Sequence, residues 1–66
     1  MQVKINGSTD EVPDNSSIID VLTARNLSGN TVIVALNDEV VTREKWENKK
    51  LNPDDCMEII RVIGGG

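Results

Sequence analysis

The sequence contains no histidine and only one cysteine, Cys56. Without histidine the chain can form neither a Ser-His-Asp triad nor an imidazole metal ligand. One cysteine excludes a disulfide within the chain and cannot complete a zinc site alone. We therefore expect no catalytic residue and no metal site. Because no histidine is present to activate Cys56, we expect it to be a small, half-buried strand residue rather than a nucleophile.

Long apolar runs and an excess of positive charge are also missing. No apolar segment approaches the roughly 20 residues of a membrane span, and the chain does not start with a signal peptide. We expect a cytoplasmic protein that makes no membrane contact. The net charge of −4 argues against binding to nucleic acid, because phosphate backbones attract basic surfaces. A small acidic protein is instead steered toward a basic surface on a partner.

The 66 residues suffice for one small domain. A domain of this size buries only about 60% of its unfolded surface, so its stability is marginal. Residues 64–66 are three glycines that follow an apolar, β-branched run. Glycine has no side chain to pack and loses the most backbone entropy when it is ordered. We expect one domain over residues 1–63 and a flexible glycine tail over residues 64–66.

The first half of the chain predicts a hairpin and one helix. Apolar and polar residues alternate over 1–6, Asn6-Gly7 is a hairpin turn signal, and a second strand follows over 8–12. The segment "DNSSIIDVLTARN" has apolar residues at helical spacing. Ser16 or Ser17 is expected to cap this helix, with Arg25 and Asn26 in its last turn.

The second half predicts three strands. Residues 31–36 form a continuous β-branched apolar run, which is typical of an interior strand. A polar turn leads to a short strand over 40–42, and residues 43–51 allow one helical turn, with Trp46 covering an edge of the core. The final strand is expected over 56–63, after a solvated acidic loop that includes Asp54 and Asp55.

The predicted order is therefore β-β-α-β-β-β. One helix can cover one face of one sheet, which indicates the α+β class and a β-grasp roll. We expect a mixed sheet of four to five strands with the main helix packed on one face. The first and last strands are expected to be parallel neighbours in the middle of the sheet.

The alternation in the final strand predicts an exposed apolar patch. If Met57 and Ile59 face the helix, then Ile60 and Val62 lie on the uncovered face, because successive strand residues point to opposite sides. The same reasoning places Ile33 beside them. Since one helix covers only one face, we interpret Ile33, Ile60 and Val62 as a partner-binding patch. The alternative is a reversed register, or a loop that covers these residues.

Three segments together resemble a known family. They are the opening "MQVKING", the central "VIVALNDEVVTREKW" and the ending "DDCMEIIRVIGGG". With the chain length and the strand order, they resemble the ThiS family, the ubiquitin-like β-grasp sulfur carriers of thiamin synthesis. Many relatives end in two glycines and this chain ends in three. A processed terminus would make Gly65 the reactive residue, whereas the chain as written makes it Gly66.

The resemblance implies a protein cosubstrate and not an enzyme. Gly66 would be adenylated by a ubiquitin-activating-like enzyme that uses ATP, while this chain binds no cofactor itself. A persulfide donor would supply sulfur, and the resulting Gly66 thiocarboxylate would pass it to a thiazole synthase. Gly64 and Gly65 would thread into the partner sites, and the free carrier would be a monomer.

Other functions remain open from the sequence. A glycine-rich terminus is shared by other ubiquitin-like carriers, so the chain could serve molybdopterin synthesis or another sulfur pathway. It could also be an interaction module that is conjugated to lysines through Gly66. Terminal glycines can also be a linker or a simple disordered extension. The molybdopterin carriers tend to be longer, which favours the thiamin pathway.

Overall fold

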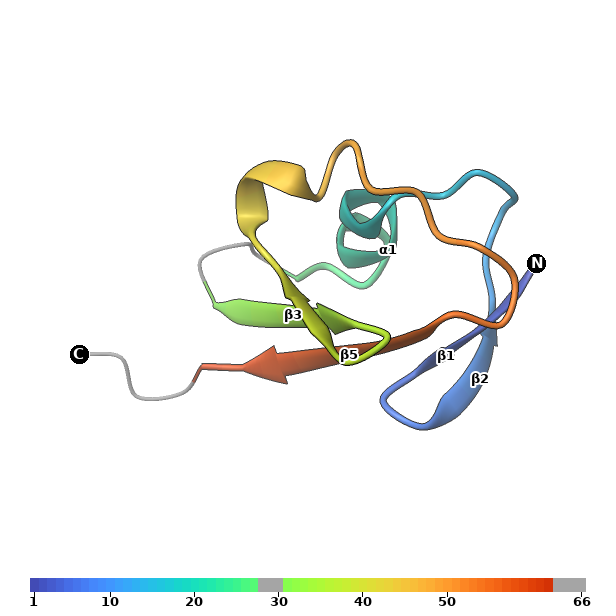
Figure 1. The fold of residues 1–66 in the computed structure, drawn as a ribbon, viewed down its shortest axis with the longest axis horizontal. Coiled ribbons are helices and arrows are strands. Elements are labelled where there is room, and N and C mark those ends of the chain that lie inside the picture. The colour runs from blue at the N-terminus through green and yellow to red at the C-terminus, as the bar shows by residue number, and fades with distance from the viewer. Residues whose placement is uncertain (28–30, 63–66) are drawn as a thin grey trace.

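In the computed structural model, which describes residues 1–27 and 31–62, the chain folds as one sheet with a helix on one side (Figure 1). The described elements are, in order, β1 Gln2–Ile5, β2 Ser8–Glu11, α1 Ile18–Ala24, β3 Val32–Leu36, β4 Glu39–Val41, the 3-10 helix η1 Arg43–Lys45 and β5 Cys56–Arg61. The predicted strand over 8–12 thus ends at Glu11, and the predicted strand over 40–42 starts and ends one residue earlier.

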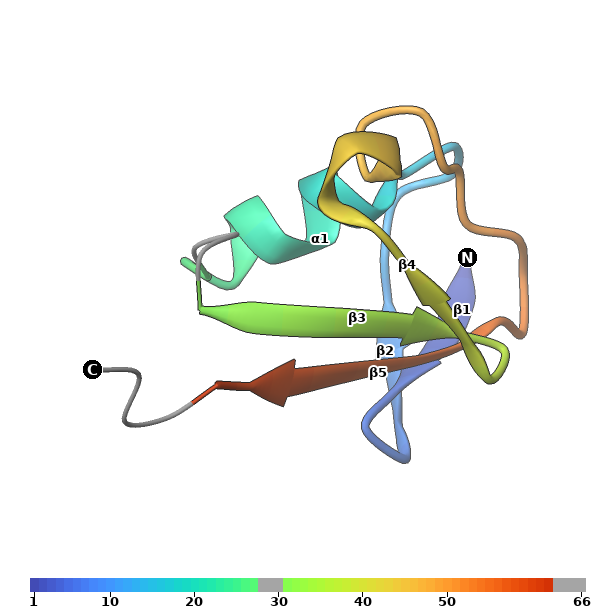
Figure 2. The same ribbon diagram turned by 60° about the vertical axis from the view of Figure 1, so that its left-hand side comes forward.

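The five described strands lie in the order β2-β1-β5-β3-β4. β1 and β5 are parallel, with Lys4 opposite Cys56 and Ile5 opposite Met57, and the other neighbours are antiparallel. Figure 2 shows α1 and η1 on the same side of β3 and β5, with no described element over the other side. The predicted mixed sheet with a central parallel pair and one covering helix is confirmed. We call the uncovered side the open face.

Two tight turns set the registers of the outer strands. Asn6 and Gly7 join β1 to β2 with φ angles of 53° and 85°, and Asn37 and Asp38 join β3 to β4 with 51° and 71°. Two successive residues with positive φ give the hairpin turn whose twist matches that of the strands. Asparagine, aspartate and glycine tolerate this backbone better than other residues do.

Helix α1 is shorter than the sequence predicts. Of the two predicted caps the structure selects Ser17: its Oγ accepts from the Asp20 amide at 3.3 Å, and its own amide donates to Asp20 Oδ2 at 2.9 Å. The backbone bond from Ser17 holds the Asp20 pKa below its usual value. The prediction that Arg25 and Asn26 belong to the last turn is wrong. Asn26 has a φ of 58°, which ends a helix.

The core lies between α1 and the covered face of the sheet. Its fully buried apolar side chains are Val3, Ile5, Ile18, Val21, Leu22, Val32, Val34, Leu36, Trp46, Leu51 and Met57. Trp46 is buried in this core, and its indole N–H donates to the Val41 carbonyl at 2.8 Å. A buried indole needs such an acceptor, so this position suits a structural tryptophan.

Two residues before and at the start of β5 differ from their predicted environments. Asp55 is not part of a solvated loop: it is nearly buried, and its carboxylate accepts from Asn37 Nδ2 at 3.1 Å and from the Asn52 amide at 2.8 Å. These donors compensate for the loss of water around the charge. Cys56 is exposed and not half-buried, because its neighbour Met57 faces the core.

Candidate functional site

The centre of the open face is formed by Ile33 of β3 and Ile60 of β5. The two residues are directly opposite one another in the antiparallel register, and their side chains are 43% and 51% exposed. Paired residues of neighbouring strands point to the same face. In β5 the residues on the other face, Met57 and Ile59, pack into or against the core. The predicted orientation of the last strand is therefore confirmed.

Val62 extends this apolar row beyond β5. Its amide donates to the Thr31 carbonyl at 2.8 Å, so the pairing with the β3 side continues past Arg61. Val62 is 50% exposed and lies two residues after Ile60, which puts both side chains on the same side. Ile33, Ile60 and Val62, the three residues predicted to form the patch, thus lie together and exposed.

Val40 is a fourth member that the sequence reasoning did not include. It lies opposite Ala35 in the β3–β4 hairpin and is 69% exposed. Ala35 is in turn opposite Glu58, so these three residues share the open face. The turn at Asn37-Asp38 was the available signal, because a two-residue turn pairs Leu36 with Glu39 and so places Val40 opposite Ala35. We call Ile33, Val40, Ile60 and Val62 the open-face patch.

The open-face patch occupies one end of the sheet. Toward β1 the open face becomes polar, with exposed Lys4, Cys56 and Glu58 on alternate positions of β1 and β5. The four patch residues are the large apolar side chains that the described chain leaves exposed. Their concentration on one face, at the end of β5 from which the chain continues, is typical of a docking surface.

The predicted tail residues Gly64, Gly65 and Gly66 lie outside the described residues, as does Ile63 at the end of the predicted last strand. In sequence they follow Val62 directly. A tail that reacts in a partner and a patch that binds the same partner would therefore be separated by very few residues. Three extended residues reach about 10 Å.

Residues 1–27 and 31–62 contain no group of three or more histidine, cysteine, aspartate or glutamate residues placed to hold a metal ion. Over the same ranges, no helix has both the length and the apolar character needed to cross a membrane. Within this part of the chain, the patch is the surface that suggests a function.

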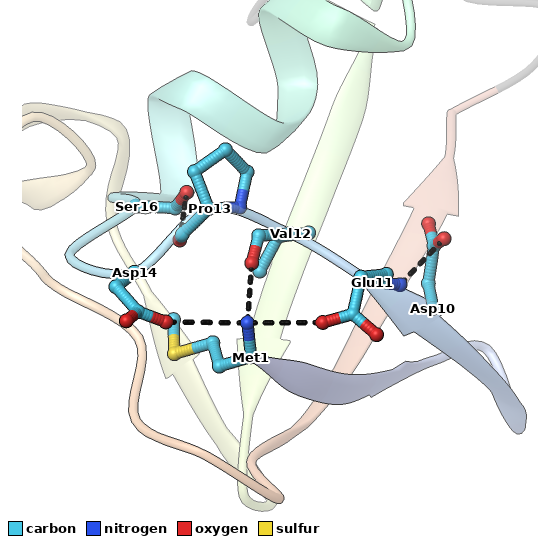
Figure 3. A network of polar contacts seen from close by, with 7 residues as sticks. All are labelled: Met1, Asp10, Glu11, Val12, Pro13, Asp14 and Ser16. Carbon is cyan, nitrogen blue, oxygen red and sulfur yellow. Dashed lines mark hydrogen bonds and ion pairs between the residues drawn. The ribbon is translucent and has the colours of Figure 1, made fainter.

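A polar network at the amino terminus has a structural role (Figure 3). The Met1 ammonium group donates to the Val12 carbonyl at 2.7 Å and lies 3.1 Å from Glu11 Oε2 and 3.2 Å from Asp14 Oδ1. The bonds to Glu11 and then Asp14 raise the pKa of this ammonium group above its ordinary value. The network fixes the start of β1 beside the end of β2, and sequence reasoning did not find it.

Comparison with known proteins decides the family. A family model described as "ThiS family" matches residues 3–66. The chain belongs to the ThiS family. It is 34% identical over 53 residues to the "Sulfur carrier protein ThiS" of Bacillus subtilis (strain 168), and the match covers 80% of each chain. The predicted family is confirmed.

Solved structures support the same assignment. A crystal structure of the thiamine biosynthesis protein ThiS from Geobacter metallireducens superposes with a TM-score of 0.85 and 28% identity, covering 100% of both chains. A solution NMR structure of a thiamine biosynthesis protein from the same organism gives a TM-score of 0.82 and 28% sequence identity. The match covers 100% of this chain and 88% of that one. The predicted β-grasp fold of this ThiS-family chain is confirmed.

Proposed function

We propose that this chain is a sulfur carrier whose C-terminal Gly66 carboxylate is adenylated and converted to a thiocarboxylate, which donates sulfur for thiazole formation in thiamin biosynthesis. Family membership supports the carrier role. The structural observation that carries the proposal is the open-face patch, which ends at Val62, four residues before Gly66. The folded domain is thus the part that a partner binds, and the reaction takes place at the C-terminal end.

The chemistry requires an activating partner. A free α-carboxyl group has a pKa of about 3.5, so at neutral pH it is an ionised and poor electrophile. Attack by the Gly66 carboxylate on the α-phosphorus of ATP, bound by the partner, releases pyrophosphate and leaves an acyl adenylate. The terminal sulfur of a persulfide then displaces AMP at the acyl carbon. A second thiol reduces the acyl disulfide and leaves the sulfur on Gly66.

The glycine tail suits this chemistry. A terminus that enters a narrow adenylating site must let its backbone approach the nucleotide closely, and a Cβ would widen it. Gly64, Gly65 and Gly66 leave the last three residues free of side chains. The same tail would then enter a thiazole synthase, with the folded domain outside both enzymes.

Membership of the ThiS family implies the partners, and the charge and the patch are compatible with binding to them. A protein with a net charge of −4 associates fastest with a basic surface, and the apolar patch supplies the short-range contact. We propose a ubiquitin-activating-like adenylating enzyme, a persulfide donor and a thiazole synthase as partners in the cytoplasm. The chain itself is a cosubstrate that is monomeric when free. It binds no cofactor, and the activating enzyme binds the ATP.

Intact-mass spectrometry tests the proposal directly. The carrier is incubated with the activating enzyme, ATP and a persulfide source, and its mass is expected to rise by the difference between one sulfur and one oxygen atom. Omission of ATP is the control. An unchanged mass would contradict the carrier function, and a covalent bond to a lysine of another protein would indicate conjugation instead.

A further inference from the structure

The two central strands differ in length. β1 ends at Ile5, whereas β5 continues from Cys56 to Arg61. Only Lys4 and Ile5 of β1 are paired with β5, opposite Cys56 and Met57. The second half of β5, which carries Ile60 of the open-face patch, therefore extends past the end of its parallel neighbour.

The side chain of Asn6 continues the hydrogen bonding where the β1 backbone stops. The Asn6 amide donates to the Met57 carbonyl at 2.9 Å. Its side-chain Oδ1 accepts from the Ile59 amide at 2.8 Å, and its Nδ2 donates to the Ile59 carbonyl at 3.3 Å. One donor and one acceptor are what a further β1 residue would offer to β5, so the carboxamide acts as one more peptide group.

This side chain is the last connection to β5 on that side in the described chain. Beyond Ile59, the described residues Arg61 and Val62 are held by β3 alone, through their pairing with Val32 and Thr31. Asn6 thus fixes β5 one residue before Ile60 and seven residues before the terminus. Its two bonds join residues that are 53 positions apart in the sequence.

The turn itself does not require this asparagine side chain. Asn15 also has positive φ, at 66°, and in the described chain its side chain makes no hydrogen bond. Glycine would satisfy either backbone at least as well. The bidentate contact of Asn6 with Ile59 is therefore a feature beyond turn formation.

We propose that Asn6 is a positioning residue that fixes the end of β5, so that the open-face patch and Val62, from which the tail leaves the domain, are presented to the activating partner in a constant relation. The proposal rests on the proposed function. When a partner holds the domain by the patch and threads the tail into its active site, movement of β5 changes where the tail starts. Misplacement of a reacting group by about 1 Å can cost of order 100-fold in rate.

Amide hydrogen exchange tests the structural part. In Asn6→Gly the turn keeps its backbone and loses both bonds, while Asn15→Gly is the matched control at another positive φ. We expect exchange of the Val62 amide to become about fivefold faster or more in Asn6→Gly, as loss of a net hydrogen bond implies. In the control it should be unchanged. Equal protection of Val62 in both variants would overturn the proposal.

Steady-state kinetics with the activating partner tests the functional part. In pyrophosphate release at saturating ATP we expect kcat to fall about 3- to 30-fold in Asn6→Gly. The KM for the carrier should stay within about twofold, because the patch is intact. Asn6→Asp keeps an acceptor for the Ile59 amide and tolerates positive φ, so its kcat should lie between those of Asn6→Gly and the wild type. A raised KM with unchanged kcat, or kcat equal to that of Asn15→Gly, would overturn positioning.

The exchange and kinetic experiments together distinguish failure of the positioning role from failure of the proposed function. If the wild-type carrier itself releases no pyrophosphate with the partner, the proposed function fails. The exchange of Val62 then decides whether Asn6 fixes β5. If the wild type reacts and Asn6→Gly reacts equally well, the function stands and the positioning role is wrong.

Discussion

On the face of the sheet that α1 covers, Val34 of β3 and Met57 of β5 are almost fully buried, whereas the same strands leave Ile33 and Ile60 about half exposed on the open face. Both faces of these strands carry large apolar side chains, and only one face has a covering element in the described chain (Figure 2). The covered face therefore stabilises the domain. The open face retains apolar area that docking can bury.

The magnitudes support this division of roles. Full burial of one valine or isoleucine side chain contributes roughly 1.5–3 kcal/mol relative to full exposure. Covering four half-exposed side chains would thus contribute a few kcal/mol, before the cost of association is subtracted. The patch alone would therefore bind weakly, which suits the proposed carrier, because such a carrier must also leave each partner.

The largest effect is expected on the covered face. Met57→Ala removes a side chain that is 1% exposed, and should lower the free energy of unfolding by about 2–4 kcal/mol through lost burial and a cavity. Urea denaturation measures this. Ile60→Ala in the same strand is the control, with an expected loss below about 1 kcal/mol. Equal losses would contradict the distinction between the two faces.

A change at the terminus should affect chemistry without affecting stability. Deletion of Gly66 shortens the chain by about 3.5 Å, and should slow adenylation by of order 100-fold or more. The midpoint of thermal unfolding should not change, because no core residue is removed. Pyrophosphate exchange with the activating enzyme measures the rate of adenylation, and calorimetry measures the midpoint of thermal unfolding. Unchanged exchange would show that Gly66 is dispensable and that Gly65 can react.

A charge on the open face should affect binding more than stability. Ile60→Glu places a carboxylate in an apolar contact and should weaken binding to the activating enzyme about tenfold or more. Thr9→Glu adds the same charge on exposed β2 and is the control. Titration calorimetry gives both affinities. Equal weakening by the two variants would mean that net charge, and not the patch, determines binding.

The smallest effects concern pH. Asp20 and Asp10 have lowered pKa values in the folded state, through bonds from Ser17 and Arg25, so their stabilisation is present above the unfolded value of 3.8 and is lost as pH falls below it. The raised pKa of the Met1 ammonium group has the opposite effect on stability. Its stabilisation is present below pH 8.0, the unfolded pKa, and is lost as pH rises through the pKa of the folded state.

Stability should therefore be highest on a plateau between these two pH values. Urea midpoints measured from acid to mildly alkaline pH provide the test. Asp20→Asn should reduce the decrease on the acid side and leave the alkaline side unchanged. A midpoint that rises above pH 8 would contradict the role of the Met1 network.

Local patterns predicted which residues face the core. The alternation in 56–62 placed Met57 and Ile60 on opposite faces, and the β-branched run of 31–36 identified an interior strand. These two inferences succeeded because each depends on periodicity, which burial of one face imposes on a strand. The parallel pairing of the first and last strands was expected from the β-grasp roll, because the sequence pattern alone does not determine it.

The remaining features depend on contacts between distant segments. The buried Asp55 accepts from the local Asn52 amide and from the side chain of Asn37, and the second donor, 18 positions away, is not visible from the acidic loop alone. The bond of Asn6 to Ile59 likewise joins opposite ends of the sequence. Val40 differs from these two, because the local Asn37-Asp38 turn was a signal that could have placed it opposite Ala35. Side-chain hydrogen bonds of this kind have no periodicity in the sequence.

The parallel pairing of β1 with β5 also determines when the protein can fold. Lys4 must meet Cys56, 52 positions further along the chain, before the centre of the sheet exists, and β3 likewise needs β5 as its neighbour. Such non-local pairing slows folding, because a long loop must close before any contact compensates for its entropy. During synthesis the first five-sixths of the chain has no central strand to assemble around. The domain is therefore expected to fold only once β5 has left the ribosome.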